Sequence, residues 1–258
     1  MNEVVTVALD HLRADPYRRI LCYPKFSNGE LERRISELSS LGIVALEFRG
    51  SRTIFSVKVL GKGCVGIVVS AQRNGGRIAV KLLRTDADRI SFDHEASMLT
   101  LANSVNVGPK LLDFSSRFLA MECLEGILLP QWVAGLAGRG RKLRLKRGLV
   151  ELLEKCHRLD RVGLDHGELS RAPKHIMVDG LDKPEIVDFE TASTVRRPSN
   201  VTSICQYLLI GSDLSAKIRR IVGPVRKRAL IAALRRYKKE ESYQTIQPIL
   251  RVLDFENL

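Results

Sequence analysis

Two short stretches carry the residues best suited to chemistry. Residues 164–178 read LDHGELSRAPKHIMV, and residues 186–193 read IVDFETAS. Each places an acidic side chain, Glu168 or Asp188, beside an apolar run with a strand pattern. A carboxylate in such a position can exchange a proton or bind a divalent cation. These stretches are either the centre of an active site or two ordinary strand–turn segments, and the residues before them must distinguish the two.

A glycine loop precedes these stretches in the chain. Gly61, Gly63 and Gly66 form G-x-G-x-x-G within LGKGCVGIVV, which also contains Lys62. In dinucleotide-binding folds the last glycine opens a helix, whereas here IVVSAQ continues as a strand. A strand, a glycine loop and a second strand are typical of the flap that covers nucleotide phosphates in kinase-like enzymes. We therefore expect these four residues to bind phosphate.

A lysine and a glutamate follow this loop at informative positions. Lys81 closes an apolar strand, and Glu95 lies on a predicted helix in HEASML. An ion pair between them would direct Lys81 toward phosphate oxygens. Further on, FLAMECLEG reads as a strand that runs into a turn, where we expect the backbone of Glu122 and Leu124 to face an adenine ring.

The order and spacing of these motifs resemble the eukaryotic-type protein kinase superfamily. The similarity is to its small atypical branch, which includes the RIO kinases and the kinase subunit of the KEOPS complex, and it covers about residues 55–195. HGELS at 166–170 is similar to the HGDL or H-x-D-L-S catalytic loop, and VDFE at 187–190 is similar to the DFG segment. The resemblance implies ATP and Mg²⁺ as cofactors and Asp188 as a metal ligand. It also implies that Glu168 orients the attacking hydroxyl and that Ser170 is the serine of the loop.

Three departures from the family pattern affect the same loop. Glu168 replaces an aspartate, which lengthens the carboxylate arm by one methylene. Pro173 stands where the family has a metal-binding asparagine, and His175 follows two residues later, where we expect it to take the second metal position. Imidazole suits Mn²⁺ better than Mg²⁺. Glu190 replaces the DFG glycine and is either a further metal ligand or a surface carboxylate.

Hydrophobic periodicity predicts an α+β protein with three segments. Residues 1–50 are expected to form a helical N-terminal extension, with one helix in EVVTVALDHL and another beginning at Ser27 or Asn28 and ending at Gly42. This extension is either a helix-turn-helix-like module or a helical addition to the next domain. Residues 51–125 form a β-rich lobe with an NGG hairpin turn, and residues 126–258 form a reduced helical lobe. Taken with the resemblance, this order of segments implies a bilobal kinase-like fold with a reduced helical C-terminal lobe.

Composition sets the class of protein and suggests a partner. The chain has 42 Lys+Arg and 29 Asp+Glu, a formal charge of +13, and five cysteines without a C-x-x-C pair, which favours a reducing compartment. It has no apolar run of membrane-spanning length, so we expect a cytoplasmic protein without membrane contact. Ten Lys/Arg and no acidic residue lie between Leu214 and Lys239. This segment is either an RNA- or ribosome-facing surface or a set of solvated helix faces.

Three functions are compatible with these observations. The first is ATP-dependent phosphoryl transfer to a protein serine or threonine, including autophosphorylation or ATP hydrolysis by a kinase-like ATPase. The second is a small-molecule phosphotransferase of the aminoglycoside-kinase type, which shares an HGD loop. The third is a pseudokinase that binds ATP and serves as a scaffold associated with RNA or ribosomes.

Overall fold

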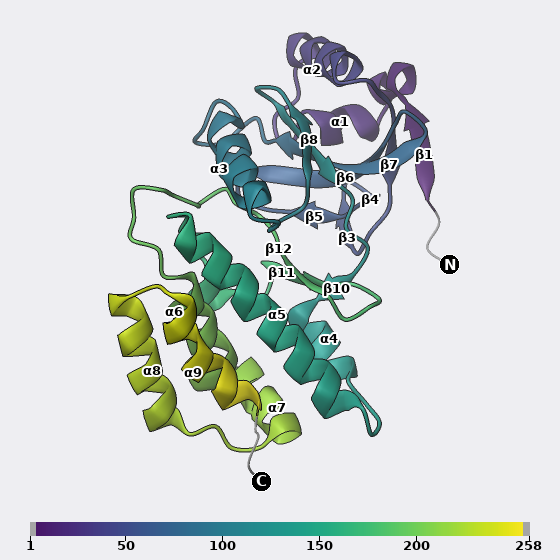
Figure 1. Ribbon diagram of the computed structural model, residues 1–258. Coiled ribbons are helices and arrows are strands. Elements are labelled where there is room, and N and C mark those ends of the chain that lie inside the picture. Colours follow the sequence, from purple (N-terminus) through teal and green to yellow (C-terminus); the bar gives the residue numbers. More distant parts are fainter. Residues whose placement is uncertain (1–3, 255–258) are drawn as a thin grey trace. The chain divides into compact units, whose positions relative to one another are not determined.

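The computed structural model of the chain describes residues 4–254 and confirms the α+β class. It combines a mostly antiparallel sheet with helices (Figure 1). The chain divides into two units. The first comprises residues 1–97 and 110–123, and the second comprises residues 98–109 and 124–258.

The first unit is built on one antiparallel sheet. Its strands are, in spatial order, β1 (Val5–Ala8), β2 (Ile43–Phe48), β6 (Gly66–Arg73), β7 (Gly76–Leu83), β9 (Phe118–Glu122) and β8 (Leu111–Phe114), and β5 (Gly61–Lys62) pairs with β6. A separate ladder joins β3 (Arg52–Ile54) to β4 (Val57–Val59). The β6–β7 hairpin turns at Asn74 and Gly75, whose φ angles of 50° and 74° fit a two-residue turn of the predicted kind.

The N-terminal segment differs from the prediction in one element. The helix expected in EVVTVALDHL is wrong over Val5–Ala8, which form the edge strand β1 paired with β2. Of these four residues Val7 is buried and the other three are exposed, and the β-branched side chains of the run favour an extended strand. A 3₁₀ helix (Leu9–Arg13) and α1 (Tyr17–Leu21) follow. Because β2 also joins β6, the segment extends the sheet of the β-rich unit rather than forming a helix-turn-helix-like module.

The second predicted helix of this segment is confirmed. Helix α2 runs over Asn28–Ser40, and the Ser27 side chain accepts a hydrogen bond from the Glu30 backbone N–H at its start. Gly42 follows with φ +69°, a conformation that glycine adopts without strain. Figure 1 shows α1 and α2 beside the strands of the sheet.

The second unit is mainly helical. Its helices are α4 (Leu129–Gly135), α5 (Arg141–Arg161), α6 (Asn200–Cys205), α7 (Asp213–Val222), α8 (Lys227–Lys239) and α9 (Tyr243–Asp254), with a π-helical turn over Gln206–Ile210. Three short strands, β10 (Ile127–Leu128), β11 (Ile176–Val178) and β12 (Pro184–Ile186), form a small antiparallel sheet. Helix α3 (Asp93–Ser104) has residues 93–97 in the first unit and its remainder in the second. The apolar face of α5 is buried and consists of Leu145, Leu149, Leu152, Leu153 and Cys156.

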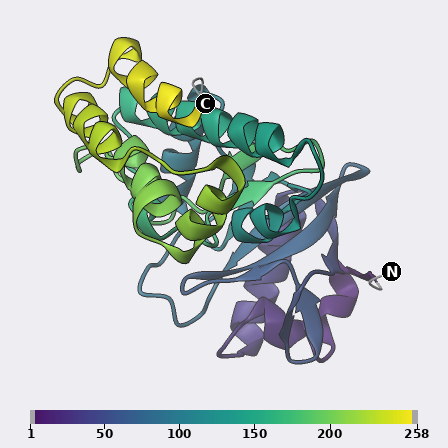
Figure 2. The same ribbon diagram turned by 90° about the horizontal axis from the view of Figure 1, so that it is seen from below.

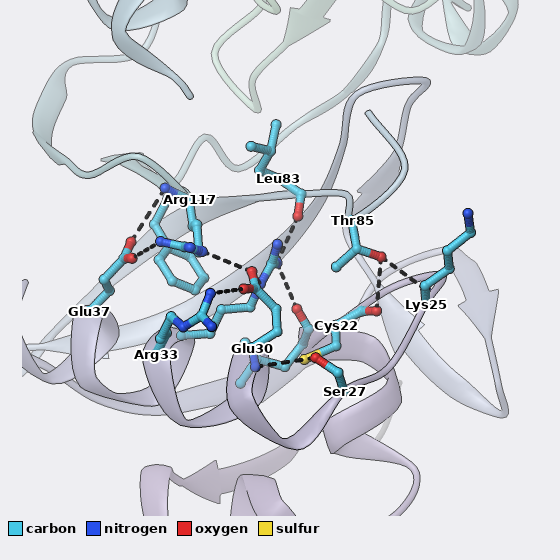
Figure 3. Close-up of polar contacts among 12 residues, drawn as sticks. Cys22, Lys25, Ser27, Glu30, Arg33, Glu37, Leu83, Thr85 and Arg117 are labelled. Atoms are coloured by element: carbon cyan, nitrogen blue, oxygen red, sulfur yellow. Dashed lines mark hydrogen bonds and ion pairs between the residues drawn. The ribbon is translucent and has the colours of Figure 1, made fainter. Parts of the chain in front are cut away.

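A charged network fixes α2 to the sheet of the first unit. The Arg34 guanidinium is buried and donates to the carbonyl oxygens of Leu21 and Leu83 at 2.8 and 2.7 Å and to Glu30 at 2.8 Å. Arg117 bridges Glu30 and Glu37 at 2.8 and 2.5 Å (Figure 3). Burial raises the pKa of Glu30, but the hydrogen bonds from Arg34 and Arg117 outweigh it and lower that pKa below its ordinary value. The network thus ties α2 to the end of α1, to the end of β7 and to the residue before β9.

Arg34→Met is expected to lower the free energy of unfolding by about 3–5 kcal/mol, because it leaves two buried carbonyls without this donor and removes one of the arginines that pair with Glu30. Arg33→Met in the next position is the control, since Arg33 is 66% exposed and pairs with Glu30 only at 3.6 Å. The control should change stability by about 0.5 kcal/mol or less. Urea denaturation of both variants checks this, and equal effects would contradict the network's importance.

Candidate functional site

The glycine loop of the sequence forms a tight hairpin in the first unit. Lys62 in β5 lies opposite Ile67 in β6, and the Gly63 N–H donates to the Gly66 carbonyl at 2.8 Å. Cys64 is exposed at the tip. A Cβ on Gly63 would have only an ordinary contact of 3.7 Å, so the tip is open on the side of that glycine. Phosphate oxygens could approach the backbone there without meeting a side chain.

Two residues from other segments brace this hairpin. The Lys62 ammonium lies 2.5 Å from the Tyr23 hydroxyl and 4.6 Å from the centre of its ring. The Arg84 guanidinium donates to the Gly63 carbonyl at 3.1 Å and is held by Asp86 at 2.8 Å. Sequence analysis missed this brace, because no local pattern connects Tyr23 to a loop 39 residues away.

The ion pair expected between Lys81 and Glu95 is present. The Lys81 ammonium lies 2.8 and 3.0 Å from the two carboxylate oxygens, with residue exposures of only 4% and 3%. Strand β7 fixes the lysine, and the first turn of α3 fixes the glutamate. Gly66 makes room for the lysine stem, since a Cβ there would lie 2.9 Å from Lys81 Cγ and 3.0 Å from the Leu82 carbonyl oxygen. The position of the buried lysine therefore depends on a glycine of the hairpin.

The strand-to-turn segment predicted to face adenine begins where β9 ends. Glu122 is exposed, and its carboxylate accepts a hydrogen bond from the Lys110 N–H at 3.2 Å. Leu124 is half-buried and is the first residue of the segment that returns to the second unit. Within that unit a Cβ on Gly126 would lie 2.5 Å from the Val178 carbonyl oxygen, so the chain passes against β11 at this point.

In the second unit, Glu168, His175 and Asp188 come together. Their side chains each offer one donor atom, and these three atoms lie within 4.8 Å of one another. His175 Nε2 is 3.5 Å from a Glu168 oxygen, and its Nδ1 is 3.9 Å from an Asp188 oxygen. Within the described chain the buried Nδ1 has no hydrogen-bond partner. Two carboxylates and an imidazole nitrogen suit Mn²⁺ and accept Mg²⁺, so the donor set fits a divalent cation.

The other predicted residues lie around this cluster. Asp188 has a φ of +71°, which is rare for a residue with a side chain and is associated with functional positions. The next residue, Phe189, is buried and its ring lies where a Cβ on Gly108 would approach to 2.8 Å. Glu190 is half-buried, and Ser170 is exposed in the 3₁₀ turn Leu169–Arg171. The buried ring of Phe189 thus anchors the residue that follows Asp188.

His166 supports the loop from the interior of the unit and does not titrate near neutral pH. It is fully buried, and burial, followed by the nearby His175, lowers its pKa to about 4. The neutral ring donates from Nε2 to the Val187 carbonyl at 3.1 Å and contacts Phe189 edge-on. Gly167 follows with φ +88°, and a Cβ there would meet the Arg196 side chain at 2.6 Å. The His-Gly pair therefore makes the sharp turn that presents Glu168.

A buried hydrogen-bond chain anchors this turn, and sequence analysis missed it. Asn200 Oδ1 accepts from the His166 N–H at 2.9 Å, and its Nδ2 donates to the Leu164 carbonyl at 2.6 Å. Asp160 accepts from the Asn200 backbone and side chain at 2.8 Å each and from the Tyr237 hydroxyl at 3.0 Å. The helix-start pattern Ser-Asn before VTSIC was the signal available for Asn200. Nothing local identified Asp160 or Tyr237.

No known protein family matches the sequence, and no curated protein matches it. Within residues 4–254, no helix is both long and apolar enough to cross a membrane. A functional conclusion therefore rests on two groups of residues. One is the glycine hairpin with the Lys81–Glu95 pair, and the other is the group of Glu168, His175 and Asp188.

Gly66→Ala is expected to push the Lys81 stem out of place and to lower the free energy of unfolding by about 1–3 kcal/mol. Gly63→Ala is the matched control, because its Cβ meets nothing closer than 3.7 Å and its φ is not positive. That variant should unfold within about 0.5 kcal/mol of the wild type. Thermal and urea unfolding of both proteins measure the difference, and an unaffected Gly66→Ala would show that the close approach is not restrictive.

Asp160 gives the anchor a pH dependence that can be measured. Burial raises its pKa from 3.8 to about 6 in the folded chain, despite the donors that point at it. Its contribution to stability is full below the unfolded pKa and is lost as the pH rises toward about 6. At about 1.4 kcal/mol for each pH unit between the two values, the loss is about 3 kcal/mol.

Comparison with Asp160→Asn isolates the contribution of Asp160, because the contributions of the other carboxylates to the pH dependence are the same in both proteins and cancel in the difference. The free energy of unfolding of the wild type minus that of the variant should fall between about pH 4 and about pH 6.5. A difference that rises over this range would mean that the hydrogen bonds outweigh burial. Urea titrations at a series of pH values supply the numbers.

Proposed function

We propose that this chain is an ATP-dependent phosphotransferase with a bilobal protein-kinase-like fold, of the small atypical type that RIO kinases represent. The observation that carries the proposal is the buried Lys81–Glu95 ion pair beneath a glycine hairpin. A buried charge pair contributes little net stability, because desolvation offsets much of the attraction. The presence of this pair at the base of an open hairpin is best explained if the fixed Lys81 ammonium binds phosphate.

The first unit supplies phosphate binding in this proposal. The backbone of the hairpin tip, from Gly61 to Gly66, approaches the phosphate oxygens, and Lys81 neutralises their charge from a fixed position. Lys62 contributes to the hairpin through Tyr23. Backbone groups at Glu122 and Leu124 bind the adenine edge.

The second unit supplies the acid and the metal ligands. Asp188 and His175 hold the divalent cation, with Glu190 as a further carboxylate, and Glu168 lies beside them. A bound Mg²⁺ or Mn²⁺ would neutralise charge on the transferring phosphoryl group. Glu168 orients the acceptor hydroxyl and takes its proton, and the exposed Ser170 borders the place where that hydroxyl arrives.

The reaction is the transfer of the γ-phosphoryl group to a serine or threonine hydroxyl. A bond forms between the hydroxyl oxygen and the γ-phosphorus, and the bond from that phosphorus to the β,γ-bridging oxygen breaks. The bonding electrons leave with ADP, and the hydroxyl proton passes to the Glu168 carboxylate. When water is the acceptor, the same steps give ADP and phosphate.

One observation favours a second candidate, an ATP-binding scaffold without turnover. A Glu168 carboxylate oxygen lies 3.5 Å from His175 Nε2, so the acid that should accept the proton already faces an imidazole. If His175 holds Glu168 in this position, the chain binds nucleotide without transferring phosphate. Both candidate functions assign nucleotide binding to the first unit, and they differ in whether the second unit transfers phosphate.

Transfer of label from γ-labelled ATP, with Mg²⁺ and with Mn²⁺, tests the proposal. We expect label on protein serine or threonine, and a fall of about 10²-fold or more in Glu168→Gln and Asp188→Asn. Glu154→Gln, an exposed carboxylate of α5 in the same unit, is the control and should retain activity.

A pair of variants separates loss of chemistry from loss of folding. Lys81→Met alone leaves Glu95 buried without this partner, whereas Lys81→Met/Glu95→Leu removes both charges and keeps an apolar volume. The double variant should unfold near the wild-type temperature and transfer no phosphate. If ATP stabilises the wild type without any turnover, the scaffold is favoured. If label appears on small-molecule hydroxyls alone, the metabolite phosphotransferase is favoured. The absence of both ATP binding and turnover would overturn the proposal.

A further inference from the structure

One side of α8 is a strongly charged surface outside the candidate site. Helical periodicity places five basic residues on that side, which we call the α8 stripe. They are Lys227, Arg228, Arg235, Lys238 and Lys239, and all five are exposed. The opposite side carries Leu230, Leu234 and Tyr237, which are buried.

The α8 stripe has no internal counter-charge. In the part of the chain that the structure describes, none of its five side chains forms an ion pair with a carboxylate. The nearby acids lie at the end of the helix, where Glu241 pairs with Arg197 at 3.7 Å and Glu240 is the exposed capping residue. Unpaired like charges on neighbouring turns repel one another, so this arrangement is unfavourable until an anion neutralises it.

The helix presents this charge from a fixed position. α8 lies beside α9 in both views (Figures 1 and 2). The Tyr237 hydroxyl contacts Asp160 at 3.0 Å and His157 Nδ1 at 2.8 Å, which locks the buried side of the helix in place. The α8 stripe is therefore a rigid row of cations rather than a mobile tail.

We propose that the α8 stripe is a docking surface for the phosphate backbone of nucleic acid, independent of the phosphotransferase activity. A helix of 13 residues is about 20 Å long, and one strand of a duplex presents a phosphate about every 3.4 Å of its axis, so the stripe can follow several phosphates. The described face offers no exposed aromatic ring on α8 for base stacking. Recognition is therefore through charge and independent of sequence.

The same observations disfavour a membrane surface. A helix that lies in a bilayer interface must insert its apolar side, but the apolar side of α8 is buried within the protein. Among the large apolar residues of α8, Ile231 is exposed, at 38%. One partly exposed isoleucine does not form an insertion face.

Binding to a fluorescent RNA duplex and to a DNA duplex of the same sequence, over a series of salt concentrations, tests this inference. The variant Lys227→Gln/Arg228→Gln/Arg235→Gln/Lys238→Gln removes four charges from the stripe. The control Arg52→Gln/Lys110→Gln/Arg139→Gln/Lys183→Gln removes four exposed charges elsewhere. Both have the same net charge, so only location differs.

We expect the wild type to bind duplex with a steep salt dependence and the control to bind within about twofold of it. The α8 variant should bind at least about tenfold more weakly at low salt, and its slope of log affinity against log salt should fall by about 0.9 for each phosphate that the variant no longer neutralises. The duplex that binds more tightly, RNA or DNA, identifies the nucleic acid whose phosphate backbone the stripe prefers. Equal weakening in both variants, or binding to phosphatidylserine vesicles without duplex binding, would overturn the proposal, as would no binding by the wild type.

Circular dichroism and thermal unfolding accompany these measurements. The substituted side chains are exposed, so both variants should keep the wild-type helix content and unfolding temperature. An intact phosphotransferase activity in an α8 variant that no longer binds duplex would show that the two properties are separate. Loss of activity together with binding would contradict their independence.

Discussion

The ion pair between Lys81 and Glu95 is the constraint on which the first unit depends. Two charges at 4% and 3% exposure are stabilised by meeting at 2.8 Å, and Gly66, which has no side chain, leaves room for the lysine stem to reach the glutamate. The hairpin above it is held by Lys62 on Tyr23 and by Arg84 on the Gly63 carbonyl. Strand, hairpin and helix α3 are thus mutually adjusted around one ammonium group.

In the second unit, buried hydrogen bonds to neutral and charged groups hold the turn that carries Glu168. The turn that carries Glu168 has a buried histidine, a glycine at positive φ and an asparagine that binds its backbone on both sides. Asp160 organises that asparagine and receives the hydroxyl of Tyr237 from α8. The loop with the candidate chemistry and the helix with the basic stripe therefore rest on the same buried carboxylate, which explains why a surface helix in this protein contains a buried tyrosine.

Local patterns were sufficient for the elements and for part of the site. The helix start at Ser27 or Asn28, the Asn-Gly turn and the two strands that it joins depend on neighbouring residues, and they were predicted correctly. The β1 strand was not, because four residues at a sheet edge gain their structure from pairing with β2. The buried hydrogen-bond chain through Asp160 was also not predicted, since Tyr237 and Asp160 are 77 residues apart and only the fold brings them together. The same holds for Arg34, a buried guanidinium that reads from the sequence as one more basic residue of a helix.

Nucleotide binding at the glycine hairpin is the central claim, and Cys64 at its tip reports on it directly. The thiol is exposed, whereas the other described cysteines are buried or half-buried, so a thiol reagent should modify Cys64 first. The account predicts that ATP with Mg²⁺ slows this modification, by about tenfold when ATP reaches about ten times its Kd, in step with site occupancy. Protection should be lost in Lys81→Met/Glu95→Leu. Modification of Cys64 at an unchanged rate in saturating ATP would contradict the claim that this hairpin covers a nucleotide.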